Sequence, residues 1–401
     1  MNAQMEYTAA RELLLQYAVP LQTERVPLAA SQGRVLAQTV SAAEDVPPFD
    51  RSAYDGYALR ACDTEKTPVT LRLTEEIAAG FVPTVPVTAG TAAKILTGAP
   101  IPEGADAVIP FEMTEFTDDT VTVLSPVKAG ANIVRRGEDV LCGTVLAPSG
   151  TRIDAFLVGT LAAQGIAAPC VYRRPRIGLI STGSELAELT EPLAAGKIRN
   201  TGRYVLAAAL EEIGCTAAYL GTARDRAEEI AALLREGLRT CDAVLLTGGV
   251  SVGDYDLTPA AMELSNVRLL VRGVALKPGM ACAYGVSAEG KLVCGLSGNP
   301  ASAMTNFYAV VLPALRRLCG LETTLSEEIA VTLTDGFGKK SKLTRILRGK
   351  LELKDGTAYV RLPQKQGNAV LSSAVGCDVM VIVPSGSGPL AAGTRLKGFL
   401  L

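Results

Sequence analysis

The pattern of hydrophobic and polar positions divides the 401-residue chain into segments of different character. Residues 7–19 place apolar side chains at helical spacing, which predicts an amphipathic helix, and residues 27–40 form a second short element. After the Pro-rich turn at 46–49, short apolar runs separated by Gly and Pro predict strands in a small, mainly β region. These runs are Val69–Leu73, Ala92–Leu96, Ala107–Ile109, Thr120–Leu124 and Thr144–Leu146.

A second helical segment follows the β region at residues 152–168. We expect it to belong with the first helix, so that the β region is an insertion between them. From residue 176 the chain alternates between buried strands and helices, which predicts a doubly wound α/β domain with a largely parallel sheet. Its predicted elements are Ile177–Ser181, Thr201–Ile213, Ala217–Leu220, Ala227–Leu238 and Ala243–Thr247.

The last part of the chain has only short β-like runs with Gly and Pro turns, which predicts a small sheet or barrel. Residues 323–401 hold 11 Lys and Arg against 6 Asp and Glu, a net charge of +5, although the whole chain carries −2. The predicted fold class is therefore α/β and multidomain. Its predicted parts are a linker domain of 1–44 and 147–172, an inserted mainly β domain of 45–146, an α/β domain of 173–322 and a C-terminal β-barrel-like domain of 323–401.

Composition excludes several kinds of chemistry. The chain has no histidine, so it cannot build a Ser-His-Asp arrangement, a histidine-ligated zinc site or an imidazole pH switch. Nine scattered cysteines without a C-x-x-C pair indicate reduced, mostly buried thiols. No apolar run reaches the roughly 18 residues of a membrane span, and the near-neutral charge gives no overall attraction to nucleic acid. We expect a cytoplasmic protein with neither a nucleic-acid nor a membrane partner.

Three polar loops follow predicted strands of the α/β domain, where open sheets bind their ligands. Residues 181–185 offer hydroxyls and a carboxylate, and residues 248–256 combine glycines, which permit close backbone approach, with acids that suit a metal. In 297–302 we expect Asn299 as N-cap and Pro300 as first helical residue, which directs free N–H groups at an anion. One such loop is usually only a turn, but three at one edge predict a binding site.

Other segments are weaker signals on their own. The polar segment 50–58 and the charge run 135–139 are typical of solvated loops, and 95–100 is typical of a strand that ends in a polar turn. A Lys-Pro-Gly turn at 277–279 places an ammonium where it could meet an anion. The chain has neither G-x-x-x-x-G-K-[ST] nor G-x-G-x-x-G after a strand. This removes the usual support for an ATPase or a nicotinamide-dependent dehydrogenase.

Taken in order, these segments resemble the molybdopterin molybdenumtransferase family, known as MoeA in bacteria and as the E domain of gephyrin in animals. The resemblance runs nearly end to end, through PPFDRSAYDGYA, ILTGAPIPEGADAVI, RRGEDV, STGSEL, TGGVSVGDYD, KPG, GLSGNPASA and the β-rich tail. It implies an elongated four-domain homodimer whose cleft lies between the α/β domain of one subunit and the inserted domain of the other. It also implies insertion of molybdate into adenylylated molybdopterin, with Mg²⁺-dependent hydrolysis that releases AMP.

The resemblance also implies roles for individual residues. The acids implied in catalysis are Asp55, Asp139, Glu185, Asp225 and Asp256, of which Asp55 and Asp256 are expected to position magnesium or activate water. Those implied in binding pterin and phosphate are Thr97, Gly248, Gly249, Ser251, Ser297, Gly298, Asn299 and Pro300. Those implied in binding molybdate are Lys277, Arg348 and Ser372. Hydrolysis of a phosphoanhydride mainly needs positioning and charge neutralisation, which acids, Mg²⁺ and helix N-termini supply without histidine.

Three positions depart from the family pattern. Met280 stands where many relatives have a second lysine after K-P-G, which leaves molybdate affinity and oxyanion selectivity open. Asn368 replaces an expected serine near the second pocket motif, and Arg51 replaces a frequent asparagine. None of these changes removes an acid.

The sequence leaves two alternative functions open. The α/β domain also resembles the molybdopterin adenylyltransferases, which act one step earlier, although a free-standing enzyme of that kind would lack the inserted domain and the basic tail. A non-catalytic molybdopterin-binding scaffold is the second alternative, because the E domain of gephyrin also binds receptor segments. The partners implied are a molybdopterin adenylyltransferase upstream and molybdoenzymes or cofactor-elaborating proteins downstream.

Overall fold

The computed structural model describes residues 4–250 and 257–401. Ser251 and Asp256, two of the predicted site residues, lie outside the described residues. The chain divides into two compact units: unit 1 comprises Met1–Gln38, Ser149–Asp154 and Ala168–Leu401, and unit 2 comprises Thr39–Pro148 and Ala155–Ala167. The finer division into four domains stays a prediction.

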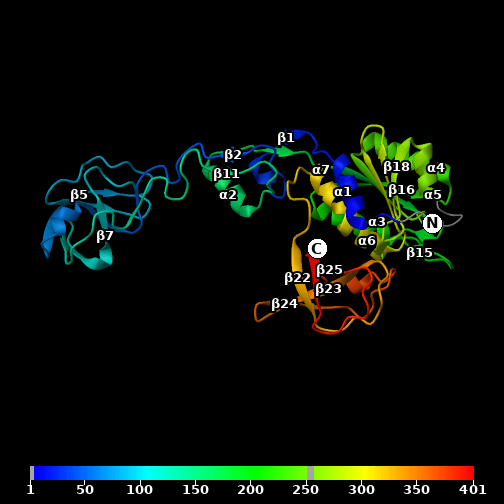
Figure 1. Ribbon diagram of the computed structural model, residues 1–401. Coiled ribbons are helices and arrows are strands. Elements are labelled where there is room, and N and C mark those ends of the chain that lie inside the picture. Colours follow the sequence, from blue (N-terminus) through cyan, green and yellow to red (C-terminus); the bar gives the residue numbers. More distant parts are fainter. Residues whose placement is uncertain (1–3, 251–256) are drawn as a thin grey trace. The chain divides into compact units, whose positions relative to one another are not determined.

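A six-stranded sheet forms the centre of unit 1 (Figure 1). Its strands are β13 (Arg176–Thr182), β16 (Thr216–Ala223), β17 (Ala243–Thr247), β18 (Val267–Arg272), β20 (Ala283–Ser287) and β21 (Leu292–Leu296). They are ordered β16-β13-β17-β21-β20-β18; the first four pair in parallel, and β20 pairs antiparallel with both of its neighbours, β21 and β18. Strands such as β17 are buried throughout because helices cover both faces of the sheet. The predicted doubly wound, largely parallel domain is confirmed.

Helices cover this sheet. They are α1 (Tyr7–Tyr17), α3 (Thr201–Glu212), α4 (Ala227–Thr240), α5 (Leu257–Leu264) and a continuous helical run of α6 (Pro300–Asn306), the π-turn η4 (Phe307–Val311) and α7 (Leu312–Leu318). Local signals set the ends of α3: the Asn200 side chain accepts a hydrogen bond from the Arg203 N–H, and Gly214 follows with φ +82°.

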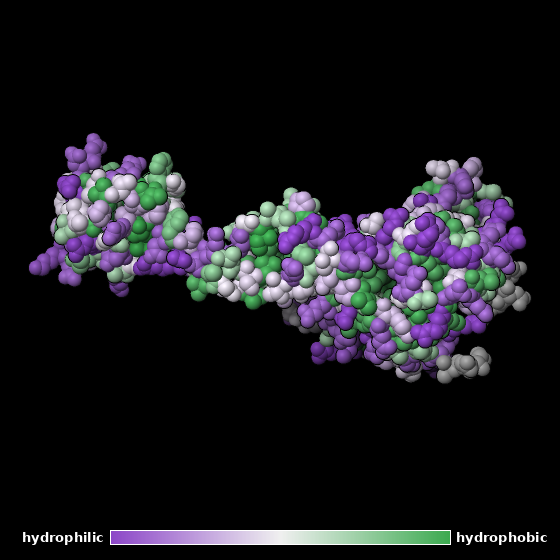
Figure 2. All heavy atoms as spheres, turned by 90° about the horizontal axis from the view of Figure 1, so that it is seen from above, coloured by the Kyte–Doolittle hydropathy of each residue, from purple (hydrophilic) through white to green (hydrophobic). Residues whose placement is uncertain are grey.

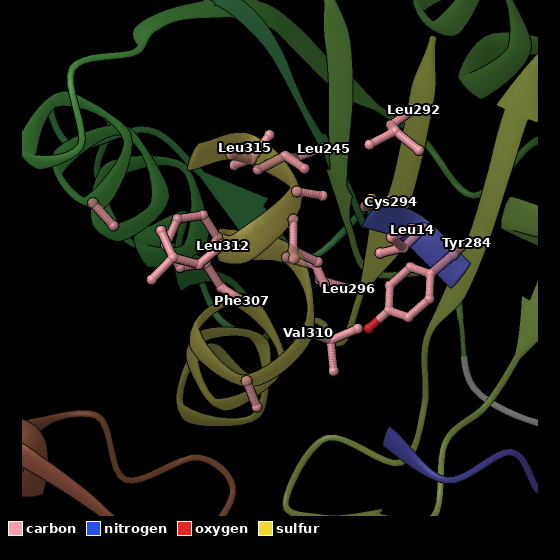
Figure 3. Packing of buried hydrophobic residues seen from close by; sticks show 14 of the residues in the cluster. Leu14, Leu245, Tyr284, Leu292, Cys294, Leu296, Phe307, Val310, Leu312 and Leu315 are labelled. Atoms are coloured by element: carbon pink, nitrogen blue, oxygen red, sulfur yellow. The ribbon is translucent and has the colours of Figure 1, made fainter. Parts of the chain in front are cut away.

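The main core of unit 1 lies between the sheet and helices α1, α3 and α6–α7. Leu14 of α1, Leu245 of β17 and Phe307 of η4 are fully buried in it (Figure 3). Burying one such side chain stabilises the fold by about 2–3 kcal/mol. A second cluster packs α4 and α5 against the sheet. The loops at the strand ends are therefore mounted on a rigid, close-packed support.

The C-terminal strands of unit 1 close into a small barrel. They are β22 (Glu328–Leu333), β23 (Thr344–Lys354), β24 (Thr357–Arg361), β25 (Val379–Val383) and β26 (Arg395–Leu400). The order is β23-β24-β22-β26-β25, and pairing of β25 with β23 closes the ring. Strand β19 (Leu276–Lys277) joins β23 in parallel, with Lys277 opposite Arg345. This pairing connects the Lys-Pro-Gly turn to the barrel. The predicted C-terminal β-barrel is confirmed.

Unit 2 contains a second six-stranded sheet (Figure 1). Its strands are β4 (Gly56–Leu59), β5 (Val69–Ile77), β6 (Thr91–Ile95), β7 (Ala107–Pro110), β8 (Thr114–Phe116) and β9 (Thr120–Val123). The order is β7-β4-β6-β5-β9-β8, antiparallel except for β5 with β6. All the predicted β runs in this unit are strands. Reading residues 50–58 as a solvated turn was wrong for 56–58, which are buried in β4.

Shorter elements complete the chain. In unit 2 these are β2 (Val40–Ser41), β3 (Arg51–Ser52), β10 (Ile133–Val134), β11 (Val145–Ala147), helix α2 (Ala155–Ala163), η2 (Ala61–Thr64) and η3 (Phe111–Met113). In unit 1 they are β1 (Thr23–Arg25), β12 (Cys170–Tyr172), β14 (Leu186–Ala187), β15 (Ile198–Arg199), η1 (Leu28–Ala30) and η5 (Ser372–Ala374). Within the described ranges, no helix combines the length and the apolar character that crossing a bilayer requires.

Candidate functional site

A cavity of about 650 Å³ opens in unit 1 at the carboxyl ends of the parallel strands. Residues that follow β13, β16, β17 and β21 line it, so the described parts of the three predicted loops meet in one place. The Lys-Pro-Gly turn after β19 supplies another part of the wall, and Leu343 and Asn368 of the barrel region supply the rest. Two further lining residues, Ile198 and Leu343, were not predicted, because neither apolar residue stands in a recognisable motif.

The glycine loop after β17 lets backbone come close to a ligand. Gly248 and Gly249 have φ of +93° and +64°, which non-glycine residues rarely adopt. A Cβ on Gly248 would also lie only 2.6 Å from the Thr182 carbonyl oxygen. Thr258 Oγ1 donates to the Gly248 carbonyl at 3.1 Å, so the loop is held from a neighbouring helix. Its fixed shape suits the binding of a phosphate by backbone N–H groups.

The start of helix α6 lies beside that loop. Asn299 is the N-cap and Pro300 the first helical residue, as predicted. The Asn299 side chain makes no capping hydrogen bond, and Gly298 lies so near the glycine loop that a Cβ on it would be 3.5 Å from Gly248 Cα. First-turn N–H groups have no partner within a helix. They are available, together with the helix dipole, to an anion in the cavity.

The Lys-Pro-Gly turn is anchored from the core. The fully buried Asn306 donates through Nδ2 to the Gly279 carbonyl at 2.5 Å, and Tyr284 donates through its hydroxyl to Asn306 Oδ1 at 2.8 Å. Lys277 lines the cavity with its side chain exposed. Asn306 was not predicted as a site residue, since nothing in the sequence around a buried helical asparagine indicates its hydrogen-bond partner.

Two acids line the cavity, Glu185 and Asp225. Asp225 accepts hydrogen bonds from the Ser184 N–H at 3.1 Å and from its hydroxyl at 2.7 Å. Glu185 folds back over Gly183, where a Cβ would collide with its carboxylate. Two carboxylates are a donor set that Mg²⁺ uses together with phosphate oxygens. Across residues 4–250 and 257–401 no group of three or more acids and cysteines is arranged for a metal, so the described acids form only a partial set.

Arg348 and Ser372 do not line this cavity. Arg348 is 2% exposed on β23, and burial lowers the pKa of its guanidinium. Its Nη2 donates to the Gly367 carbonyl at 3.4 Å, while its Nε has no hydrogen-bond partner. The guanidinium thus lies behind the loop that carries Asn368 into the cavity wall. Ser372 is exposed at the start of η5, which packs against β23.

The remaining predicted residues belong to unit 2. Asp55 and Thr97 are paired: Asp55 Oδ1 accepts from the Thr97 N–H at 2.6 Å and from its hydroxyl at 2.7 Å. These two hydrogen bonds lower the pKa of the Asp55 carboxyl. Asp139 is exposed in the turn before β11, where its N–H donates to the Val46 carbonyl at 2.9 Å. The neighbouring arginines are structural, since Arg135 pairs with Asp50 and Arg136 with Asp45.

Family models match most of the chain. Residues 5–165 match "MoeA N-terminal region (domain I and II)", residues 178–317 match "Probable molybdopterin binding domain" and residues 330–399 match "MoeA C-terminal region (domain IV)". The matches cover both units described above.

Whole-chain comparisons agree with these matches. The chain is 34% identical over 388 residues to a molybdopterin molybdenumtransferase of Bacillus subtilis (strain 168), covering 95% of this chain and 90% of that protein. It is 35% identical over 375 residues to one of Staphylococcus aureus (strain Mu50), covering 92% and 88%. The crystal structure of the molybdopterin biosynthesis MoeA protein from Pyrococcus horikoshii OT3 has a TM-score of 0.85 and 33% identity, with each chain fully covered. The chain belongs to the molybdopterin molybdenumtransferase family.

Proposed function

We propose that this protein inserts molybdate into adenylylated molybdopterin, with Mg²⁺-dependent hydrolysis of the phosphoanhydride and release of AMP. Family membership supports an enzyme of molybdenum cofactor biosynthesis. The proposal rests mainly on the cavity of unit 1, where the glycine loop, the start of α6, two described carboxylates and a lysine meet. Its volume of about 650 Å³ suits a ligand of nucleotide size.

The glycine loop and the start of α6 would bind the phosphates. The first turn of α6 presents backbone N–H groups, and the glycines allow the loop backbone to approach a ligand closely. The described part of the glycine loop, residues 248–250, and the segment 297–302 carry no carboxylate that would repel an anion. Because Thr258 and the packing of Gly298 on Gly248 hold these segments, little ordering is needed when the substrate binds. Fixed N–H donors also stabilise the charge that develops on phosphate oxygens during hydrolysis.

Magnesium fits the acids of the cavity in chemical type. Glu185 and Asp225 supply hard oxygen ligands, and substrate phosphates would complete the set. When bound, the ion supplies neutralisation of phosphate charge. Asp225 is already oriented by Ser184, whereas Glu185 must swing away from Gly183 to reach a ligand. The predicted role of Asp256 stays a prediction.

Molybdate would bind between the turn after β19 and the barrel. Lys277 offers an exposed ammonium at the cavity wall, and Arg348 offers a buried guanidinium with one unpaired N–H. Desolvated donors bind a small dianion strongly, since water does not compete for them. Ser372 stands on η5 against the strand of Arg348 and would contribute a hydroxyl. Met280 lines the same cavity, so a softer side chain replaces the second cation of many relatives.

We further propose a homodimer in which Asp55, Thr97 and Asp139 of one copy complete the cavity of the other. Helix α2 supports it: its sequence AFLVGTLAA is almost entirely apolar, yet only Leu161 is buried and Phe156 is 88% exposed. Figure 2 shows hydrophobic residues at the surface in this part of unit 2. Such a face is typical of a protein interface. Two hydrogen bonds from Thr97 orient the Asp55 carboxylate and favour its ionised form, which supports the role proposed for it in this cleft.

The proposed substrate and product indicate which reactions must come directly before and after this one. An adenylyltransferase must supply adenylylated molybdopterin, and molybdoenzymes or cofactor-elaborating proteins must accept the product. A cytoplasmic location is proposed because all nine cysteines are free thiols.

The test is AMP release from adenylylated molybdopterin by the purified protein, with and without molybdate and Mg²⁺, alongside reconstitution of an apo-molybdoenzyme. Molybdate-dependent AMP release with active cofactor is the expected result. If the protein binds adenylylated molybdopterin but releases no AMP and forms no active cofactor, the proposed catalysis is wrong and a non-catalytic scaffold is favoured. ATP-dependent adenylylation of free molybdopterin would place the protein one step earlier.

A mixing experiment tests the shared cavity. Asp55→Asn and Lys277→Ala variants should each be nearly inactive, but refolded together at equal amounts they should regain about a quarter of wild-type activity, because half of the dimers then contain one intact site. If mixing restores nothing while sedimentation shows mixed dimers, the cavity does not take these residues from a second copy.

A further inference from the structure

Two thiols meet at a place that the proposed function does not use. Cys215 and Cys319 are 104 residues apart in sequence, yet their Sγ atoms lie 3.6 Å apart. Cys215 is 0% exposed and Cys319 is 6% exposed. Cys215 follows the glycine that ends α3, and Cys319 directly follows α7. Both are free thiols, so the fold holds a dithiol in contact.

The surroundings of the pair favour reaction at Cys319. Cys319 lines a surface crevice of about 10 Å³ together with Arg173, Arg174 and Gly214, a volume close to the least that a water molecule needs. The hydrogen bond from Cys215 and the nearby Arg152, Arg174 and Arg316 lower the pKa of the Cys319 thiol. The same contact and burial raise the pKa of Cys215. The thiol that ionises more readily is therefore also the one that borders a surface crevice.

We propose that Cys215 and Cys319 form a peroxide-reactive site that closes to a reversible disulfide. The Cys319 thiolate attacks hydrogen peroxide; a sulfur–oxygen bond forms, the oxygen–oxygen bond breaks and hydroxide leaves, giving a sulfenic acid. The Cys215 sulfur then attacks Cys319; the disulfide bond forms, the sulfur–oxygen bond breaks and water leaves. Two thiols and one peroxide become a disulfide and two waters, and two electrons pass from sulfur to peroxide. A dithiol reductant reverses the step.

The position of the pair gives the disulfide a consequence. Ile198, just before α3, and Asn299, just before α6, both line the cavity. Helices α3 and α6 contact each other. Cys215 and Cys319 stand at the far ends of these two helical segments. A disulfide there would link the two helical segments covalently and close a long loop of the chain. Closing the loop restricts the unfolded chain, so the disulfide should raise the melting temperature.

The experiment uses the full-length protein with Cys62→Ser and Cys142→Ser, because these exposed thiols would otherwise link separate molecules. The reduced protein is treated with hydrogen peroxide, unfolded in N-ethylmaleimide and analysed by mass spectrometry. The expected product is a Cys215–Cys319 cross-linked peptide pair that dithiothreitol releases. The equally buried Cys241, which has no cysteine beside it, should remain alkylatable and is the internal control.

Variants separate the two roles. Cys215→Ala should still react at Cys319 but stop at sulfenic or sulfinic acid, whereas Cys319→Ala should protect Cys215 from oxidation. The oxidised parent protein should melt several degrees higher than its reduced form, and the difference should vanish in either variant. The proposal is wrong if Cys215 and Cys319 stay alkylatable after peroxide treatment, if Cys241 oxidises as fast as they do, or if the oxidised parent melts no higher than the reduced one.

Discussion

The side-chain amide of Asn306 donates a hydrogen bond to the backbone carbonyl of Gly279 at 2.5 Å. Asn306 is fully buried and accepts in turn from the hydroxyl of Tyr284. Gly279 adopts φ +109°, and Asn306 fills the space that a side chain there would need. The core therefore fixes the turn that presents Lys277 to the cavity.

Replacing Asn306 should affect both stability and the site. Asn306→Ala leaves a carbonyl and a hydroxyl without partners in the core, which should lower the free energy of unfolding by about 2–4 kcal/mol in urea titrations. The released turn should raise the Kd for substrate or molybdate. Tyr284→Phe is the matched control, since it keeps the bond to Gly279. An equal rise in Kd for both variants would show that the turn does not depend on Asn306.

Gly248→Ala should be costly because it combines a left-handed backbone with a collision. The backbone alone costs about 1–2 kcal/mol, and a Cβ so close to Thr182 adds strain of about the same size or more. Gly290→Ala is the matched control, with φ +82° and no atom within 4 Å of the new Cβ. Urea titrations give the free energy of unfolding of both variants, and the difference between them is the cost of the collision with Thr182. Equal losses of unfolding free energy in the two variants would show that the collision costs nothing.

The pairing of Asp55 with Thr97 should appear in the pH dependence of stability. Because hydrogen bonds from Thr97 lower the pKa of Asp55, the stabilisation is complete above the carboxyl's unfolded pKa of about 3.9 and is lost as pH falls through the lower folded pKa. The Tm difference between wild type and Thr97→Val should thus be present near pH 7 and shrink below about pH 4. A difference that stays constant down to about pH 2 would contradict this assignment.

Asp225→Asn should weaken the dependence on magnesium. The amide oxygen can still accept from Ser184, so the loop keeps its shape while the cavity loses one negative charge. The Mg²⁺ concentration for half-maximal AMP release should rise about tenfold or more. Asp225→Ala also removes the hydrogen-bond acceptor of Ser184, so its half-maximal Mg²⁺ concentration should rise further than that of Asp225→Asn. An unchanged magnesium titration for Asp225→Asn would remove this acid from the site.

Arg348→Ala should separate molybdate from the pterin substrate. We expect the molybdate concentration for half-maximal activity to rise at least about tenfold, because a buried charge-assisted contact is lost. The KM for adenylylated molybdopterin should change little, since Arg348 does not line the cavity. If the half-maximal molybdate concentration and the KM for adenylylated molybdopterin rise by the same factor, Arg348 acts only by supporting the loop of Gly367 and Asn368.

Much of the fold follows from local sequence. Alternating buried strands and helices predicted the α/β sheet, and Asn299-Pro300 predicted the start of α6, because caps and periodicity act over a few residues. The three strand-end loops were also predictable, since parallel strands bring their carboxyl ends to one edge. Strand β4 was missed because its short buried run lies within a polar segment.

The tertiary structure decided which distant residues meet. Asn306 with Gly279, Cys215 with Cys319, and the burial of Arg348 behind the loop of Asn368 leave no trace in local spacing. Each depends on how helices and barrel pack, and packing is set by the fit of many side chains at once. The sequence thus determined the family, the elements and the chemical groups of the site, whereas the packing determined which of those groups share a cavity.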